Sequence, residues 1–135
     1  MTLSLIRLLF DFGLLVMIWM VQLVVYPGFK YYHRERLMKW HNIYTARISY
    51  VVLPLMLGQL LLSGIQLWGA ISWYTLGSFL IIALLWGITF LQFVPLHYTI
   101  SKGNFNEETI LQLVKKNWFR TMLWTFLFLC SLATL

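Results

Sequence analysis

The chain has 135 residues, of which 61% are hydrophobic and 10% are charged. A soluble domain carries about 25% charged residues, and a chain of this size buries only about two-thirds of its surface, so this composition excludes a soluble globular fold. It predicts one integral membrane domain over residues 1–135. The net charge of +6 suits nucleic acid or a membrane surface. Because the basic residues flank apolar segments, we expect anionic lipids and not nucleic acid as the partner.

Four apolar segments are long enough to cross a bilayer as a helix, which takes about 20 residues. Pro27 and Gly28 are expected to end the first helix, since this pair cannot continue it. Asn106 is the expected N-cap of the fourth helix, which opens with two glutamates that suit the helix dipole. The pattern predicts an all-α antiparallel bundle of four transmembrane helices, roughly at 3–26, 45–67, 73–97 and 107–135.

Basic residues are divided unevenly between the two sides that this topology creates. Nine lie in or beside the first and third loops, whereas Arg7 is the only one near the termini or the middle loop. The positive-inside rule therefore predicts that both termini lie on the non-cytoplasmic side. Asp11 lies one helical turn from Arg7, and we expect these two residues to form a local salt bridge.

Polar residues gather at one end of every predicted helix, beside the basic loops. Polar groups at membrane depth are unfavourable unless they face the bundle interior or water, so four such ends predict a shared pocket. The residues are Gln22 and Tyr26 in the first helix, His41, Tyr44 and Arg47 at the second, His97 in the third, and Asn117, Trp118, Arg120, Thr121 and Trp124 in the fourth.

These residue types suit an oxidoreductase acting on an amphipathic, aromatic or quinone-like molecule. An imidazole titrates near neutral pH, so His41 or His97 would be the general base, with Tyr44 beside them. Arg47 and Arg120 would hold an anionic group or stabilise developing negative charge. The remaining substrate-binding candidates are Gln22, Tyr26, Asn117, Trp118, Thr121 and Trp124. The sequence requires no cofactor for this role.

Two alternatives stay open. In the first, His41 and His97 are the axial ligands of haem b, and the arginines pair with its propionates. In the second, the protein is a non-catalytic lipid-binding or assembly subunit whose basic face holds head groups. A zinc site is not expected, because no carboxylate or thiolate lies at ligand spacing near the two histidines. The expected partners are the bilayer with its anionic lipids, an amphipathic small molecule and further copies of the chain.

Four motifs carry a resemblance to known proteins. They are Tyr26-Pro27, His41-x-x-Tyr44-x-x-Arg47-Ile48, Pro95-x-His97 and Asn117-Trp118-x-Arg120-Thr121-x-x-Trp124-Thr125. Across nearly the whole chain, the pattern resembles a group of small bacterial four-helix membrane proteins that are loosely related to the anthrone-oxygenase-like family. That family oxidises polycyclic aromatics with no evident cofactor. The resemblance implies a multi-pass protein of the bacterial inner membrane, with these positions as its site.

A weaker resemblance is to four-helix membrane haem proteins, including a bacterial protoporphyrinogen oxidase. They share the layout and a similar exit from the first span. The histidine that is typical inside their first helix is missing in this chain, which weakens the expectation of haem.

Overall fold

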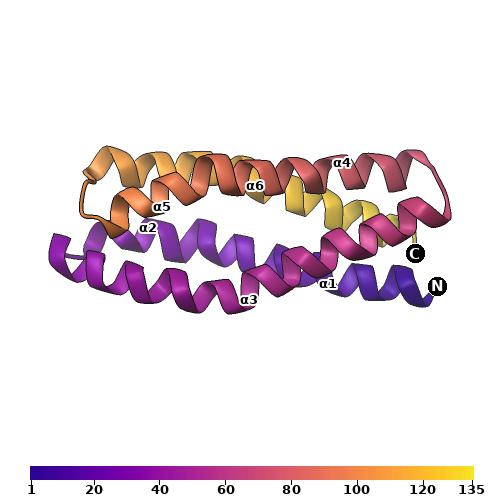
Figure 1. Ribbon diagram of the computed structural model, residues 1–135, viewed down its shortest axis with the longest axis horizontal. Helices are drawn as coiled ribbons and strands as arrows, with labels where there is room; N and C mark the ends of the chain where they lie inside the picture. The colour runs from indigo at the N-terminus through magenta and orange to yellow at the C-terminus, as the bar shows by residue number, and fades with distance from the viewer.

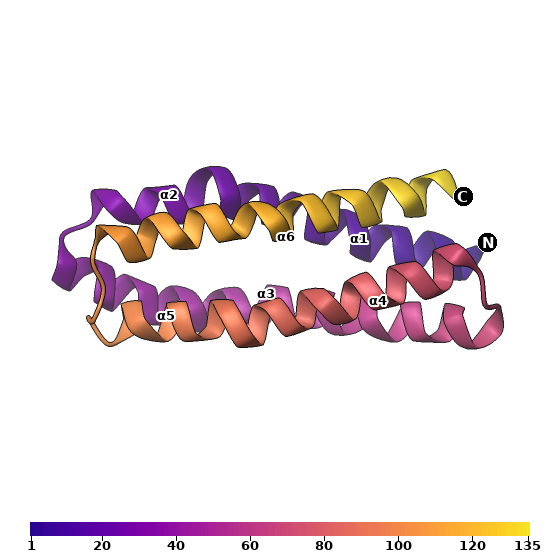
Figure 2. The same cartoon turned by 90° about the horizontal axis from the view of Figure 1, so that it is seen from above.

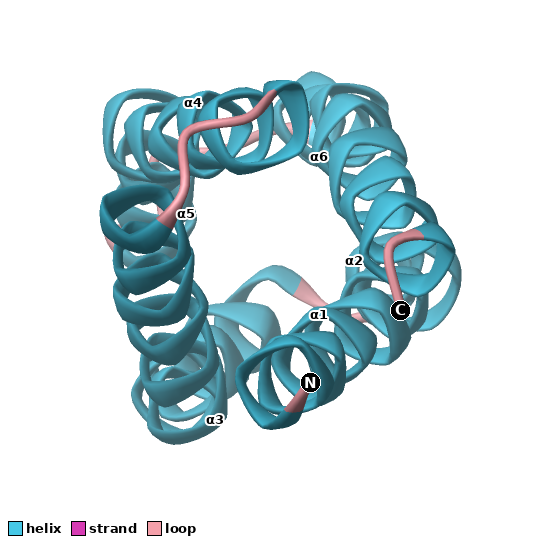
Figure 3. Ribbon diagram, turned by 90° about the vertical axis from the view of Figure 1, so that its right-hand side faces the viewer, coloured by secondary structure: helices cyan, strands magenta, loops and turns pink.

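The computed structural model describes all 135 residues, which form four long helical rods and no strand. Neighbouring rods run antiparallel (Figure 1), and seen end-on they surround a common axis (Figure 3). The prediction of an all-α four-helix bundle is confirmed. The rods consist of α1 (Thr2–Met20), η1 (Val21–Val25), α2 (Tyr26–Gly28) and η2 (Phe29–Tyr31); α3 (Arg34–Gly69); α4 (Trp73–Ile88), η3 (Thr89–Phe93) and α5 (Val94–Ser101); and α6 (Glu107–Ala133).

The two ends of the bundle differ in what they carry. Both termini and the loop between α3 and α4 lie at one end, which we call the terminal end (Figure 2). The loop between η2 and α3 and the loop between α5 and α6 lie at the other, which we call the basic end because most lysines and arginines are near it. Asn106 caps α6 as expected, and its side chain accepts a hydrogen bond from the backbone N–H of Thr109 at 3.0 Å.

Three of the four rods are long and apolar enough to cross a membrane: Thr2–Tyr31, Arg34–Gly69 and Trp73–Ser101. The fourth, α6, has 27 residues, but its half nearer the basic end carries two glutamates, two lysines and Arg120. By length and composition the chain is therefore a membrane protein with three clear spans, where the sequence pattern predicted four.

Three helix boundaries differ from those predicted. The first rod continues through Pro27 and Gly28 to Tyr31, α3 begins at Arg34 and not near residue 45, and the third rod ends at Ser101 and not at 97. The apolar pattern locates the part of a helix that suits lipid. It does not detect the polar turns by which the same helix continues beyond that part. The first rod passes Pro27 because a π-helical turn comes before it.

Both rods that contain a π-helical turn also contain a proline just after it. The turns η1 and η3 each begin the same number of residues before a proline, Pro27 and Pro95 respectively. Proline lacks an N–H and crowds the backbone carbonyl of the preceding turn. A π-helical turn lengthens the backbone hydrogen-bond spacing there by one residue, which gives the proline ring room. Both turns lie in the half of the bundle toward the basic end, and they set the direction of the residues that follow them, including Tyr26 and His97.

The outside of the bundle is apolar, and its buried polar residues lie within a largely apolar core, where polar groups are expected in a protein in lipid. Large apolar side chains such as Leu9, Tyr50 and Leu91 are exposed around the rods, at 62%, 80% and 83%. Twelve buried residues are polar or charged. Two arginines are among them, and their surroundings differ.

Candidate functional site

A chain of four hydrogen-bonded side chains joins three of the rods near the basic end. His97 Nε2 lies 2.9 Å from the hydroxyl oxygen of Tyr26, and His97 Nδ1 lies 2.7 Å from His41 Nε2. His41 Nδ1 lies 2.8 Å from Ser101 Oγ. We call Tyr26, His97, His41 and Ser101 the histidine chain. The rings of His41 and His97, which the sequence predicted to share one site, are in direct contact.

Local structure explains this placement. His97 and Ser101 are one turn apart on α5, so both face α3, where His41 lies fully buried. The imidazoles stack with centroids 4.9 Å apart. Phe29 packs edge-on against His41 at 5.5 Å, and Tyr44 contacts both rings at 6.1 and 6.5 Å. Aromatic packing of this kind fixes the orientation of each imidazole.

A cavity of about 690 Å³ lies beside this chain. Tyr26, His97 and Ser101 from the histidine chain line it, and His41 lies behind them. Tyr44 and Arg120, two further predicted site residues, also line it. Several lining residues are half exposed on the outside of the bundle, including Phe90 at 50% and Val94 at 48%. The cavity therefore opens sideways between α3 and the η3–α5 rod, toward the surface that would face lipid.

Arg120 is the buried charged residue at the wall of the cavity, which the exposed Lys102 also lines. Its side chain is 5% exposed, and its Nε has no hydrogen-bond partner within the protein. Its guanidinium lies over the rings of Phe93 at 4.0 Å and Trp124 at 5.3 Å. The structure has one ion pair, and that pair joins Arg7 to Asp11. Arg120 is thus a buried cation beside two aromatic rings and the Tyr26 hydroxyl, and it forms no ion pair with a carboxylate.

Gln22, Asn117 and Thr121 form a separate small cluster between η1 and α6. Asn117 Nδ2 and Thr121 Oγ1 both donate to Gln22 Oε1, at 2.9 and 3.0 Å, and Gln22 Nε2 donates to the carbonyl of Val114 at 3.1 Å. None of the three lines the cavity. Their mutual hydrogen bonds hold η1 against α6, which also carries Arg120.

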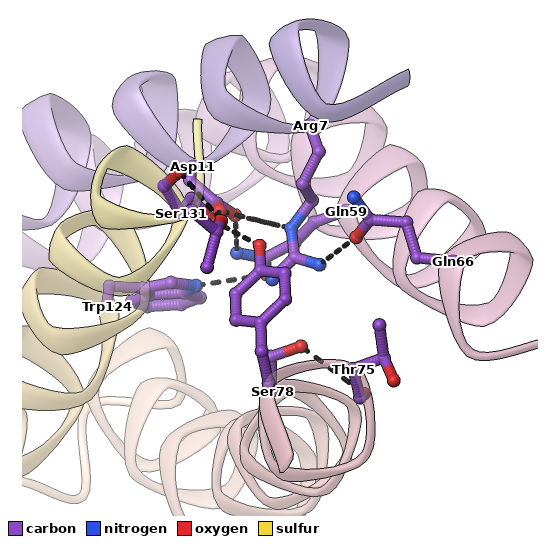
Figure 4. A network of polar contacts seen from close by, with 10 residues as sticks. Arg7, Asp11, Gln59, Gln66, Thr75, Ser78, Trp124 and Ser131 are labelled. Atoms are coloured by element: carbon purple, nitrogen blue, oxygen red, sulfur yellow. Dashed lines mark hydrogen bonds and ion pairs between the residues drawn. The ribbon is translucent and has the colours of Figure 1, made fainter. Parts of the chain in front are cut away.

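A second polar network fills the bundle near the terminal end (Figure 4). Arg7 Nε donates to Asp11 at 3.0 Å, as expected for a local salt bridge, and both side chains are fully buried. Gln59 Nε2 donates to Asp11 at 2.6 Å, and Ser131 donates to the same carboxylate. We call the following residues the Arg7 network: Arg7, Asp11, Gln59, Gln66, Tyr74, Trp124 and Ser131.

Trp124 belongs to the Arg7 network and not to the cavity wall. Its Nε1 donates to Gln59 Oε1 at 3.3 Å, and its side chain is fully buried. It shares the face of α6 that carries Asn117, but it lies about two turns, roughly 10 Å, further toward the terminal end. Trp124, which was expected to stack on a ligand, is therefore not among the residues that line the cavity.

Arg47 and Trp118 lie outside the cavity. Arg47 is exposed, because each three-residue step along a helix falls about 60° short of a full circle, which turns Arg47 about 120° away from His41. Trp118 is 40% exposed and packs edge-on against Trp19 at 5.8 Å. Its neighbour Asn117 faces the interior, so Trp118 faces outward.

Most residues that line the cavity were not predicted from sequence, and two of them, Ser101 and Thr89, have notable hydroxyl groups. Ser101 ends the histidine chain, and Thr89 lines the cavity with an Oγ1 that is buried without a hydrogen-bond partner. The one-turn spacing from His97 to Ser101 could have signalled the first, but the predicted helix ended at residue 97. No signal in the sequence marks Thr89, a single hydroxyl within an apolar segment.

The two histidines do not fit haem in this arrangement. Bis-histidine ligation needs one free nitrogen on each ring, with the iron between them. All four ring nitrogens of His41 and His97 are within hydrogen-bond distance of a protein atom, and the 2.7 Å contact leaves no room for iron. No group of three or more His, Cys, Asp or Glu side chains is placed to hold a metal ion.

Comparison with protein families, with curated proteins and with solved structures finds no match to this chain.

Proposed function

We propose that this membrane protein binds an amphipathic aromatic or quinone-like molecule in the cavity, and that the histidine chain exchanges a proton with an oxygen of that molecule. The observation that carries the proposal is Arg120, a buried cation without a counter-ion at the wall of a lipid-facing cavity of about 690 Å³. A buried charge without a partner is unfavourable by several kcal/mol, so a ligand that brings an anionic or strongly accepting oxygen would be held tightly there.

The lining favours a flat ring over an acyl chain. Five of its side chains are aromatic, drawn from α2, α3 and the η3–α5 rod, and aromatic faces stack on flat ligands. Phe93 is 1% exposed and lies under Arg120, which places a ring and a cation on the same wall. The aromatic lining residues are Tyr26, Tyr44, Phe90, Phe93 and Tyr98. An aromatic ligand is also what the resemblance to the anthrone-oxygenase-like family implies.

Proton transfer is the chemistry that the residues themselves offer. Tyr26 lines the cavity, and its hydroxyl is hydrogen-bonded to His97 at 2.9 Å, which is within the range that general acid–base catalysis requires. Arg120 would stabilise negative charge on the same oxygen. The electrons of a quinone reaction would come from a second reactant, so the proposal covers binding and proton exchange.

Ligand binding can be measured on the whole protein in lipid nanodiscs by calorimetric titration. Decylubiquinone serves as the quinone probe and lauric acid as the acyl probe. We expect decylubiquinone to bind, and Arg120→Gln to weaken binding about ten- to a hundredfold, the value of a hydrogen bond to a charged group. Arg47→Gln is the matched control, because it removes the same charge from an exposed site, and it should leave affinity unchanged.

Each other result has a definite meaning. Equal loss in Arg120→Gln and Arg47→Gln would indicate a general charge effect and contradict the proposal. Binding of lauric acid but not decylubiquinone, with the same dependence on Arg120, would replace the aromatic ligand by a fatty acid. Mass spectrometry of molecules that co-purify with the protein would identify the natural ligand.

A second candidate function is binding of an anionic phospholipid. A groove of about 600 Å³ lies on another side of the bundle, and its apolar walls also carry three polar residues, Gln92, Thr99 and Lys116. A basic residue beside an apolar groove suits a head group and its acyl chain. Loss of co-purified anionic lipid in Lys116→Ala, with retention in Lys102→Ala, would support this function.

A further inference from the structure

We propose that the histidine chain is a relay for one proton, which enters at Ser101, the end of the chain nearer the basic end of the bundle, and leaves at Tyr26 toward a ligand, although both residues line the cavity. The inference rests on the proposed function, because it supplies the proton that a ligand oxygen would receive. It is carried by three consecutive hydrogen bonds of 2.8, 2.7 and 2.9 Å, which connect four side chains without a gap.

Hydrogen bonding restricts the protons of this chain to two arrangements when both rings are neutral. A neutral imidazole donates from one nitrogen and accepts at the other. Across the 2.7 Å contact, one of the two facing nitrogens carries the proton and the other does not. The tautomers of His41 and His97 are therefore linked: both rings carry the proton on Nδ1, or both carry it on Nε2.

The two arrangements give the Tyr26 hydroxyl opposite hydrogen-bonding roles toward a ligand in the cavity. With both protons on Nδ1, Tyr26 donates to His97, and its oxygen can accept from a ligand. With both protons on Nε2, His97 donates to Tyr26, and the tyrosine O–H is free to donate to a ligand oxygen. The chain thus matches either a protonated or a deprotonated ligand.

Conversion between the arrangements moves one proton along the chain. Starting with both protons on Nε2, Tyr26 gives its proton to the ligand oxygen and receives one from His97 Nε2. His97 Nδ1 then receives the proton of His41 Nε2, and His41 Nδ1 receives the proton of Ser101, which is partly exposed and would be reprotonated by a water molecule. One proton enters at Ser101, one leaves at Tyr26, and the net charge of the four side chains is unchanged.

The groups around the chain favour neutral rings. Arg120 and Lys102 line the same cavity as His97, and Phe29 and Tyr44 pack on the imidazoles. No carboxylate forms an ion pair with either ring, since the one ion pair lies in the Arg7 network. A second positive charge beside Arg120 would be opposed by repulsion and by burial.

Nitrogen NMR of protein labelled with ¹⁵N-histidine reads the tautomers directly, and the exposed His33 serves as an internal reference. Ser101→Ala removes the partner of His41 Nδ1. A buried N–H without an acceptor is less favourable than a bare ring nitrogen, so both rings should shift toward the Nε2–H form. Tyr26→Phe removes the partner of His97 Nε2 and should shift both rings toward the Nδ1–H form. Each change in tautomer ratio should be about tenfold.

Ser49→Ala is the matched control. Ser49 also lines the cavity, but its hydroxyl donates to the carbonyl of Ala46 at 2.6 Å and does not contact the chain. It should leave both rings as in the native protein. Adding decylubiquinone to the native protein should shift both rings toward the Nε2–H form, including His41, which does not line the cavity. Tyr26→Phe should abolish this response.

The relay is overturned if the two neutral rings carry different tautomers, or if Ser101→Ala changes His41 alone. These outcomes are separable from failure of the proposed function. Linked rings in a protein that binds neither probe would retain the chain and reject the ligand, whereas Arg120-dependent binding with unlinked rings would retain the ligand and reject the relay.

Discussion

Each half of the bundle buries one arginine, and the two arginines differ in the groups that surround them. Arg7 is fully buried and pairs with Asp11, which also accepts from Gln59 and Ser131. Arg120 is 5% exposed, faces aromatic rings and lines a cavity. The Arg7 network is nearly complete within the chain, although one nitrogen, Arg7 Nη2, remains without a partner.

The difference indicates which polar cluster holds the fold together and which is built for a ligand. A buried charge that has its partner contributes to the native structure, and removal of that partner is strongly destabilising. A buried charge that lacks a partner lowers stability until something else supplies one. The two halves should therefore respond to mutation with opposite signs.

The largest effect is expected at Asp11. Asp11→Asn leaves Arg7 buried without a countercharge, and it should lower the free energy of unfolding by about 3–5 kcal/mol, measured by denaturant titration in mild detergent. The double variant Arg7→Met, Asp11→Leu removes both charges and should recover most of this loss. A decrease below about 1 kcal/mol in Asp11→Asn would show that the pair is not the anchor of this half.

Arg120→Met should act in the opposite direction. It removes a desolvated cation, and although it also removes two cation–π contacts, the relief of desolvation is larger. We expect the free energy of unfolding to rise by up to about 2 kcal/mol, while decylubiquinone binding weakens at least as much as in Arg120→Gln. A stability loss as large as that of Asp11→Asn would place Arg120 among the structural residues and remove the contrast between the halves.

Trp124→Phe tests the boundary between the halves, since Trp124 contacts both Gln59 and Arg120. Loss of its N–H should lower the free energy of unfolding by about 1 kcal/mol, the net value of one hydrogen bond. Probe affinity should stay that of the native protein, because Trp124 does not line the cavity. Reduced affinity at native stability would move Trp124 back to the site, as the sequence suggested.

Arg47→Gln should have the smallest effect. The side chain is exposed and makes no hydrogen bond or ion pair with the protein, so stability should change by less than about 0.5 kcal/mol. The same denaturation and binding measurements apply. A clear loss of affinity would show that the ligand reaches beyond the cavity to this residue.

Much of this architecture could be predicted from the sequence, because apolar length reports a helix in lipid directly. The four rods, the cap at Asn106 and the Arg7–Asp11 pair followed from local patterns. The helix ends did not, since polar turns such as 34–44 and 98–101 continue the helices outside the apolar segments. Ser101 was missed for this reason.

The site could be predicted less well. The direction in which a side chain points depends on how the helices pack, and the spacing of residues along a helix describes that direction only roughly. Tyr26, Tyr44, His97 and Arg120 line the cavity as a shared pocket requires. Gln22, Asn117 and Thr121 bond to one another instead, since η1 and α6 approach closely there. The sequence also does not reveal a π-helical turn, so the directions of Tyr26 and His97 could not be calculated from a regular 3.6-residue repeat.

The widened turns η1 and η3 have a consequence for how such a protein can change over time. Each adds one residue to its rod, and removal of that residue would rotate everything downstream by about 100°. Tyr26 or His97 would then point away from the cavity, although the Tyr-Pro and Pro-x-His letters remained intact. A chain with the same motifs but with one residue deleted upstream of either proline would thus keep the sequence motifs of the site and lose its geometry.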